Sequence, residues 1–89
     1  MTVTNNHDKG LNIYWVNQHS NPPSYVHQTH VDPSSRVTLH TYVGHQFIWA
    51  LPGGNPEKPT PVPGTRAMQI KQGKMSYSFS EVLNKKDEL

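Results

Sequence analysis

Turn-forming residues cut this chain into short segments and leave no uninterrupted stretch for a long helix. Its 89 residues include eight proline and six glycine residues, and only 33% of the side chains are hydrophobic. The large apolar side chains fall in short runs bounded by turn signals, which is the pattern of β-strands. A chain of this length forms one domain and buries only about 60–65% of the surface that its unfolded form exposes. The sequence therefore predicts a single all-β domain with a small core.

Six segments have the polarity pattern of strands. In the first, Ile13 and Trp15 share one face and alternate with residues of the other face, as a strand with one buried face requires. The last two are joined by residues 72–73 and are expected to form a hairpin. We expect Trp49 to be deeply buried and Trp15 to lie at the rim of a cavity. The expected strands cover residues 11–16, 24–31, 36–42, 46–51, 66–71 and 74–79.

The two ends of the chain differ from its patterned middle. Residues 1–9 are polar and lack apolar periodicity, so we expect a flexible lead-in. Residues 10–80 form the expected β domain, and residues 81–89 are expected to be an exposed carboxy-terminal tail. Ser80 precedes a segment that can form one helical turn, although Leu83 stands where a capping box needs an acidic residue.

Composition argues against several classes of function. The net charge is only +2, and the basic residues are scattered, so no nucleic-acid partner is expected. The chain has no cysteine, which excludes disulfides and thiol catalysis. No apolar stretch approaches the ~18–20 residues that span a bilayer, so we expect no membrane insertion. The sequence also lacks a nucleophile elbow, a phosphate-binding loop and paired carboxylates, which predicts that the chain is not an enzyme and needs no cofactor.

Six histidine residues raise the question of a metal site. His27 and His30 lie on one expected strand, and His40 and His45 follow close by. Residues three apart on a regular strand point to opposite faces, so His27 and His30 are not expected to chelate together. No carboxylate lies between them to complete a ligand set. We therefore expect no metal site.

Five residues on three successive expected strands combine aromatic surface with polar groups. An indole, a phenol and a phenyl ring supply apolar walls, while a hydroxyl and an imidazole supply a polar pair. This is the chemistry of a small pocket for a ring that carries one hydroxyl. Ordinary core packing of the aromatic rings and a structural role for the histidine are the alternatives. The five residues are Trp15, Tyr25, Thr41, His45 and Phe47, with His40 beside them.

The run from His40 to Phe47, HTYVGHQF, together with an earlier Trp15 and a Tyr25 ten positions beyond it, resembles part of a known family. That family is the β domain of the von Hippel-Lindau tumour suppressor, in which an early Trp, a Tyr and a His-Ser-Tyr-x-Gly-His-x-Trp run recognise 4-hydroxyproline. The resemblance covers about residues 11–50. Thr41 stands where the family has Ser, Phe47 stands where it has Trp, and about three extra residues lie between Tyr25 and His40.

The resemblance implies a small β sandwich of about six to seven strands that acts as a non-catalytic peptide-recognition module. Its ligand would be a peptide or protein segment that contains 4-hydroxyproline. The resemblance implies that Trp15, Tyr25 and Phe47 pack on the pyrrolidine ring. The Thr41 hydroxyl and a ring nitrogen of His45 would bond the hydroxyl of the ligand.

The resemblance also implies that the peptide backbone lies extended along a strand edge, where Tyr25 and His40 add hydrogen bonds. The helical domain through which the tumour suppressor joins a ubiquitin ligase has no counterpart in this sequence, so no ligase-adaptor role is expected. The alternative function is a structural or assembly β-sandwich module that binds a protein partner through an edge strand, with a vestigial pocket.

The chain ends in the endoplasmic-reticulum retrieval tetrapeptide, at the only place where that signal works. The signal is an address read by the KDEL receptor, so we expect location in the endoplasmic-reticulum lumen and a leader upstream of Met1. Prolyl hydroxylation of secreted chains occurs in that compartment, which suits a module that targets an attached protein to hydroxylated clients. If the order of these four residues arose by chance in a charged tail, the expected location is instead the cytoplasm. The four residues are Lys86, Asp87, Glu88 and Leu89.

Overall fold

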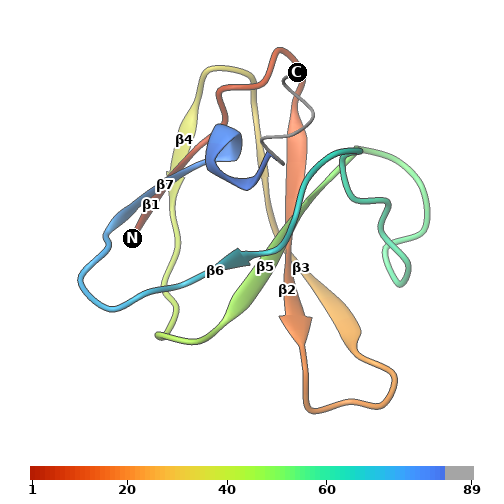
Figure 1. Ribbon diagram of the computed structural model, residues 1–89. Coiled ribbons are helices and arrows are strands. Elements are labelled where there is room, and N and C mark those ends of the chain that lie inside the picture. Colours follow the sequence, from red (N-terminus) through yellow and green to blue (C-terminus); the bar gives the residue numbers. More distant parts are fainter. Residues whose placement is uncertain (84–89) are drawn as a thin grey trace.

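Seven strands and one short 3₁₀ helix make up the described part of the chain, residues 1–83, in the computed structural model (Figure 1). Four strands form one sheet in the order β3-β2-β5-β6, and three form a second sheet in the order β4-β1-β7. One hydrophobic core joins the two sheets, which confirms the prediction of a small all-β sandwich. The elements are β1 (Thr2–Thr4), β2 (Leu11–Asn17), β3 (Ser24–Val31), β4 (Arg36–Thr38), β5 (Gln46–Ala50), β6 (Met68–Gln69), β7 (Ser76–Ser78) and η1 (Phe79–Val82).

Strand β2 lies inside the four-stranded sheet and carries much of the core. It pairs antiparallel with β3 on one side and with β5 on the other. Leu11 and Ile13 are fully buried, and Ile13 stands opposite Trp49 of β5, which is also fully buried. Trp15 is only partly buried and packs against the edge of the same core. Trp49 is therefore more deeply buried than Trp15, which confirms that part of the prediction. The position of Trp15 at the rim of a cavity stays a prediction.

Strand β1 is the central strand of the three-stranded sheet, so the prediction that residues 1–9 form a flexible lead-in is wrong. β1 pairs antiparallel with β4 and parallel with β7. Val3 is fully buried, and so is Asn5, the residue that follows the end of the strand by one position. A three-residue strand with a single apolar residue between two threonines is too short to produce a periodic signal, which explains why the pattern does not reveal it.

Strands β6 and β7 do not form the predicted hairpin. β6 pairs with β5 in the four-stranded sheet, whereas β7 pairs with β1 in the other sheet. The chain turns at Gly73, whose φ of 81° is left-handed, and crosses from one sheet to the other. Met68 of β6 and Tyr77 of β7 are both buried in the common core. The polarity pattern found the buried residues of both strands, but it carries no information about which neighbour each strand pairs with.

The described part of the predicted carboxy-terminal tail is also packed against the domain. Val82 in η1 is buried, and Thr65 and Leu83 form an isolated antiparallel bridge. A capping box at Ser78 and Glu81 starts η1, two residues earlier than the Ser80 turn that the sequence suggests. The β domain therefore extends from β1 through η1 rather than over residues 10–80. Within residues 1–83 no helix has the length and apolarity needed to cross a membrane.

Candidate functional site

Trp15 and Phe47 form a cross-strand pair on the core-facing side of β2 and β5. They stand directly opposite each other in the antiparallel ladder, so their side chains lie on the same face of the sheet. Phe47 is 3% exposed and belongs to the core, whereas Trp15 keeps part of its surface open. The pair therefore provides one buried wall and one accessible wall.

Thr41 and His45 lie on the connection between β4 and β5, which passes from one sheet to the other (Figure 1). The predicted strand over residues 36–42 ends at Thr38, and the chain then turns, with the His45 amide donating to the Tyr42 carbonyl at 3.1 Å. Gly44 in this turn has a φ of 94°, a left-handed value that favours glycine. The turn brings the Thr41 hydroxyl oxygen to 3.0 Å from Nδ1 of His45.

The imidazole of His45 lies between two aromatic side chains. Its ring centroid is 5.5 Å from that of Trp15 at an interplanar angle of 48°, and 5.6 Å from that of Tyr42 in an edge-to-face arrangement. Two backbone hydrogen bonds with Ile70 fix the same turn to the neighbouring chain: the Gly44 amide donates to the Ile70 carbonyl, and the Ile70 amide donates to the His45 carbonyl. The turn that carries the Thr41–His45 pair is therefore fixed to the segment at Ile70, and its imidazole lies against Trp15 of β2.

The Thr41–His45 pair can serve a hydroxyl that both donates and accepts. With a neutral imidazole protonated on Nε2, Thr41 donates to Nδ1, and its oxygen still accepts from a ligand. Nε2–H is then the matching donor, and no hydrogen bond between described residues uses that atom of His45. One acceptor and one donor, next to an exposed part of an indole, are what a ring hydroxyl requires.

Tyr25 is the one predicted aromatic wall that the structure does not bring to this group. In the β2–β3 ladder Tyr25 stands opposite Val16, whereas Trp15 stands opposite Val26. Successive side chains of a strand point to opposite faces, so Tyr25 and Trp15 lie on different faces of the sheet. The spacing of ten residues between them carries no information about the hairpin register that decides this.

His40 is exposed and borders a hollow of about 290 Å³. This hollow is lined by Met1, Leu39, His40, Thr41 and Tyr42. The amino-terminal group of the chain donates to the Leu39 carbonyl at 2.9 Å beside this hollow. Thr41 is therefore shared between the hollow and the Thr41–His45 pair, and His40 flanks the candidate site rather than lining its aromatic part.

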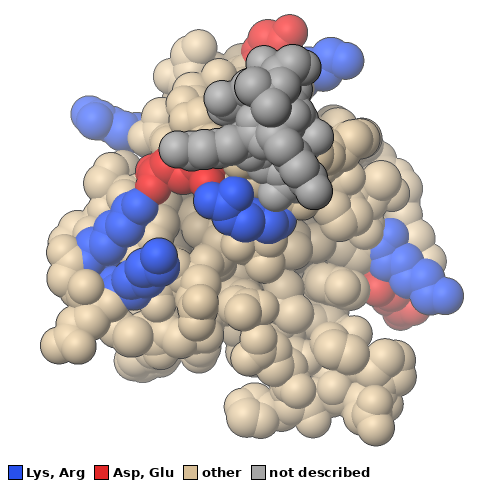
Figure 2. All heavy atoms as spheres, in the orientation of Figure 1, with Lys and Arg blue, Asp and Glu red and all other residues tan. Residues whose placement is uncertain are grey.

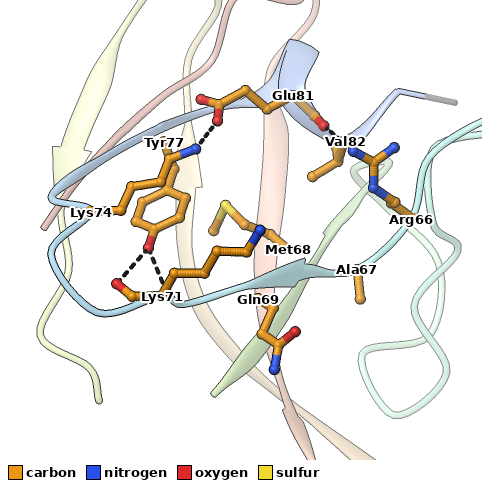
Figure 3. Close-up of a pocket in the computed structure, with 9 residues that line it drawn as sticks. All are labelled: Arg66, Ala67, Met68, Gln69, Lys71, Lys74, Tyr77, Glu81 and Val82. Carbon is orange, nitrogen blue, oxygen red and sulfur yellow. Dashed lines mark hydrogen bonds and ion pairs between the residues drawn. The ribbon is translucent and has the colours of Figure 1, made fainter. Parts of the chain in front are cut away.

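A hollow of about 280 Å³ between β6, β7 and η1 was not predicted from the sequence (Figure 3). The Arg66 guanidinium donates to the backbone carbonyls of Glu81 and Leu83 at its edge. The Lys74 ammonium beside Glu81, together with hydrogen bonds from Ser78, lowers the pKa of the Glu81 carboxyl. The spacing of Ser78 and Glu81 is the sequence signal that could have revealed this corner.

Three basic side chains, Arg66, Lys71 and Lys74, line this hollow together with Glu81. On the face drawn in Figure 2, other Lys and Arg side chains lie apart from one another, some of them beside an acidic side chain. Within residues 1–83 no group of three or more His, Cys, Asp or Glu side chains is placed to hold a metal ion. The retrieval tetrapeptide at Lys86, Asp87, Glu88 and Leu89 lies outside the described residues.

None of the protein-family models, curated proteins and solved structures compared with this chain matches it. The grounds for a function are therefore the residue pattern and the geometry of the Thr41–His45 pair beside Trp15.

Proposed function

We propose that this chain is a non-catalytic module that recognises peptide segments containing 4-hydroxyproline. The observation that carries the proposal is the 3.0 Å contact between the Thr41 hydroxyl and Nδ1 of His45, with the imidazole against the accessible ring of Trp15. The pyrrolidine ring would pack on Trp15, with Phe47 as the buried wall behind it. The ligand hydroxyl would donate to the Thr41 oxygen and accept from Nε2–H of His45.

The polar pair supports discrimination against unmodified proline. A proline ring in the same position would desolvate the Thr41 oxygen and the free ring nitrogen of His45 without replacing their bonds to water. Each polar group left without a partner in this way costs roughly 1–3 kcal/mol. A site built to bond a hydroxyl can therefore reject the analogue that lacks it, whereas the aromatic walls alone would bind both rings.

Calorimetry with matched peptides tests the proposal. Peptides that contain 4-hydroxyproline are expected to bind at least about tenfold more tightly than their proline twins, which is ~1.4 kcal/mol. Thr41→Val removes the hydroxyl at nearly constant volume and is expected to reduce this ratio. Thr38→Val makes the same change at an exposed position of β4 and is the matched control, with no expected effect. Trp15→Ala is expected to weaken both peptides equally.

Two results would contradict the proposal. One is the absence of detectable binding for a panel of hydroxylated peptides by a chain whose circular dichroism shows the β fold. The other is an equal affinity for hydroxylated and unmodified peptides. Tyr25→Phe provides a further check, because the register places Tyr25 on the other face, and the ratio should not change.

A second candidate function is an assembly module that binds a partner strand along β3. The eight residues of β3 form an edge of the four-stranded sheet, and Val26 on this strand is 44% exposed. An exposed edge strand offers unpaired backbone groups to another chain. Tyr25→Lys adds a charge to this strand on the face away from Trp15, so it would weaken such pairing and leave hydroxyproline binding unchanged. Light scattering and calorimetry on this one variant therefore separate the two functions.

We propose the endoplasmic-reticulum lumen as the place of action, from the carboxy-terminal tetrapeptide alone. With a secretory leader attached, the chain is expected to stay in the cell, and deletion of Lys86 to Leu89 is expected to release it to the medium. Lys85→Ala lies just outside the tetrapeptide and is the control, with retention expected. Equal retention with and without the last four residues would show that they are not an address.

A further inference from the structure

The β2–β3 ladder contains an irregularity that places two histidines on the same face. Tyr14 pairs with His27, but its neighbour Ile13 pairs with Thr29, so Gln28 is an extra residue in β3. Such a bulge adds one residue to one strand and reverses the alternation of the faces beyond it. The expectation that His27 and His30 point to opposite faces is therefore wrong.

Both imidazoles face the side chain of Asn12 on β2. Nδ1 of His30 lies 2.9 Å from Oδ1 of Asn12, and Nε2 of His27 lies 3.5 Å from the same oxygen. The ring of His27 is also in edge-to-face contact with Tyr14, with centroids 5.3 Å apart. Three donor atoms from two strands thus converge on the solvent-facing side of the sheet.

The ring of His30 is positioned from two further directions. Its second nitrogen, Nε2, lies 3.4 Å from a carboxylate oxygen of Asp32. A Cβ atom at Gly10 would lie only 2.6 Å from that same nitrogen, so the ring occupies space that only a glycine leaves free. A carboxylate on the outer nitrogen is the usual partner of a metal-bound histidine, because it orients the ring and fixes its tautomer.

We propose that Nε2 of His27, Nδ1 of His30 and Oδ1 of Asn12 bind a divalent transition-metal ion of the zinc class. Ligand atoms around a tetrahedral ion with bonds of about 2.0–2.1 Å are ~3.3 Å apart. The two nitrogen-to-oxygen distances, 2.9 and 3.5 Å, fall on either side of that value. Imidazole nitrogen selects zinc, copper or nickel over magnesium and calcium, which prefer oxygen ligands.

Without an ion, one of these two contacts is an ordinary hydrogen bond and the other is weak. The 2.9 Å contact of His30 with Asn12 has the usual length, whereas the 3.5 Å contact of His27 is at the long limit for a hydrogen bond and stabilises little as such. Two imidazoles and one amide oxygen leave a fourth position open to water, so the site is an exposed one of moderate affinity. His30 is 45% exposed, so an ion has access to the site from solvent.

Titration of the full chain with zinc chloride by calorimetry tests this site. One ion per chain is expected, and His27→Ala and His30→Ala should each weaken binding on the order of tenfold or more. His19→Ala removes an exposed histidine from the loop between β2 and β3 and is the matched control, with unchanged affinity expected. NMR spectra should show the ring signals of His27 and His30 shifting together on addition of zinc.

Asn12→Ala tests the third proposed ligand. It removes the amide oxygen that both imidazoles face, so zinc binding is expected to weaken relative to the wild type. Asn12→Asp, which exchanges this amide oxygen for a stronger carboxylate ligand, is expected to bind zinc more tightly than the wild type. The proposal is overturned if His27→Ala and His30→Ala bind zinc as tightly as His19→Ala, or if the wild type binds none while its β fold is intact.

Discussion

The fully buried amide of Asn5 gives the most direct test of how the amino-terminal segment is held. Its Nδ2 donates to the carbonyls of Lys9 and Val31, each at 2.9 Å, and its Oδ1 accepts from the His7 amide at 2.9 Å. Its backbone also exchanges hydrogen bonds with residues 34–35, next to β4. Asn5→Ala removes all three side-chain hydrogen bonds but keeps the backbone hydrogen bonds with residues 34–35.

The expected loss of stability follows from these three bonds. A typical intramolecular hydrogen bond contributes about 1 kcal/mol net. Lys9 is exposed, so water can replace its lost partner, whereas Val31 is fully buried and its carbonyl would lose a partner at a cost of roughly 1–3 kcal/mol. Together these contributions predict that Asn5→Ala lowers the free energy of unfolding by about 3 kcal/mol, a large part of the ~5–15 kcal/mol of a typical domain.

Urea unfolding followed by tryptophan fluorescence measures this loss, and Asn6→Ala is the matched control. Asn6 has the same side chain one position later, with two hydrogen bonds to Ser80, but it is exposed. Water can replace both bonds, so the control should lose only about 0.5 kcal/mol. Equal midpoints for Asn5→Ala, Asn6→Ala and the wild type would refute this reasoning, because they would indicate that residues 1–9 form a flexible lead-in.

Three further outcomes are expected in the same unfolding assay. Lys74 lowers the folded-state pKa of Glu81, so the carboxylate stabilises the fold at pH values above its unfolded pKa of about 4.3. This stabilisation is lost as the pH falls through the folded-state pKa. The pair is exposed, so Glu81→Gln should cost at most ~1 kcal/mol at pH 7 and nothing at low pH. A Cβ atom at Gly44 would meet no atom within 4 Å. Gly44→Ala should therefore lower the free energy of unfolding by only about 1 kcal/mol, the cost of the left-handed φ. Val3→Ala should cost ~2 kcal/mol and Val37→Ala, which is half-buried, clearly less.

The sequence predicted the strands whose apolar residues recur over five or more positions. β2, β3 and β5 lie within a residue of the segments expected for them, because each has a long enough run to show its period. β1 was missed since its one buried residue, Val3, stands alone between threonines. The wrong hairpin has a different cause: the chain around Gly73 crosses between sheets, and such partner choice depends on contacts distant in sequence.

The candidate site was predictable to the extent that it depends on local spacing. Thr41 and His45 are four residues apart in one turn, and the structure brings them within hydrogen-bonding distance. The placement of Tyr25 depends instead on the register of the β2–β3 hairpin, and a shift by one residue moves a side chain to the other face. No glycine or proline in the sequence indicates the bulge at Gln28. The placement of His27 and His30 on the same face of the sheet was therefore not predicted.

The two proposed sites lie on opposite faces of β2 and can therefore be tested independently. Trp15 of the peptide site shares the core-facing side with Ile13, whereas Asn12 of the metal site lies on the other face of β2, with Tyr14. Side chains that share no partner change stability and binding additively. Trp15→Ala should weaken peptide binding and leave the zinc affinity unchanged, and His30→Ala should do the reverse. If either substitution alters both affinities while the β fold persists, the two sites are coupled through the strand, and the separation argued from its alternation fails.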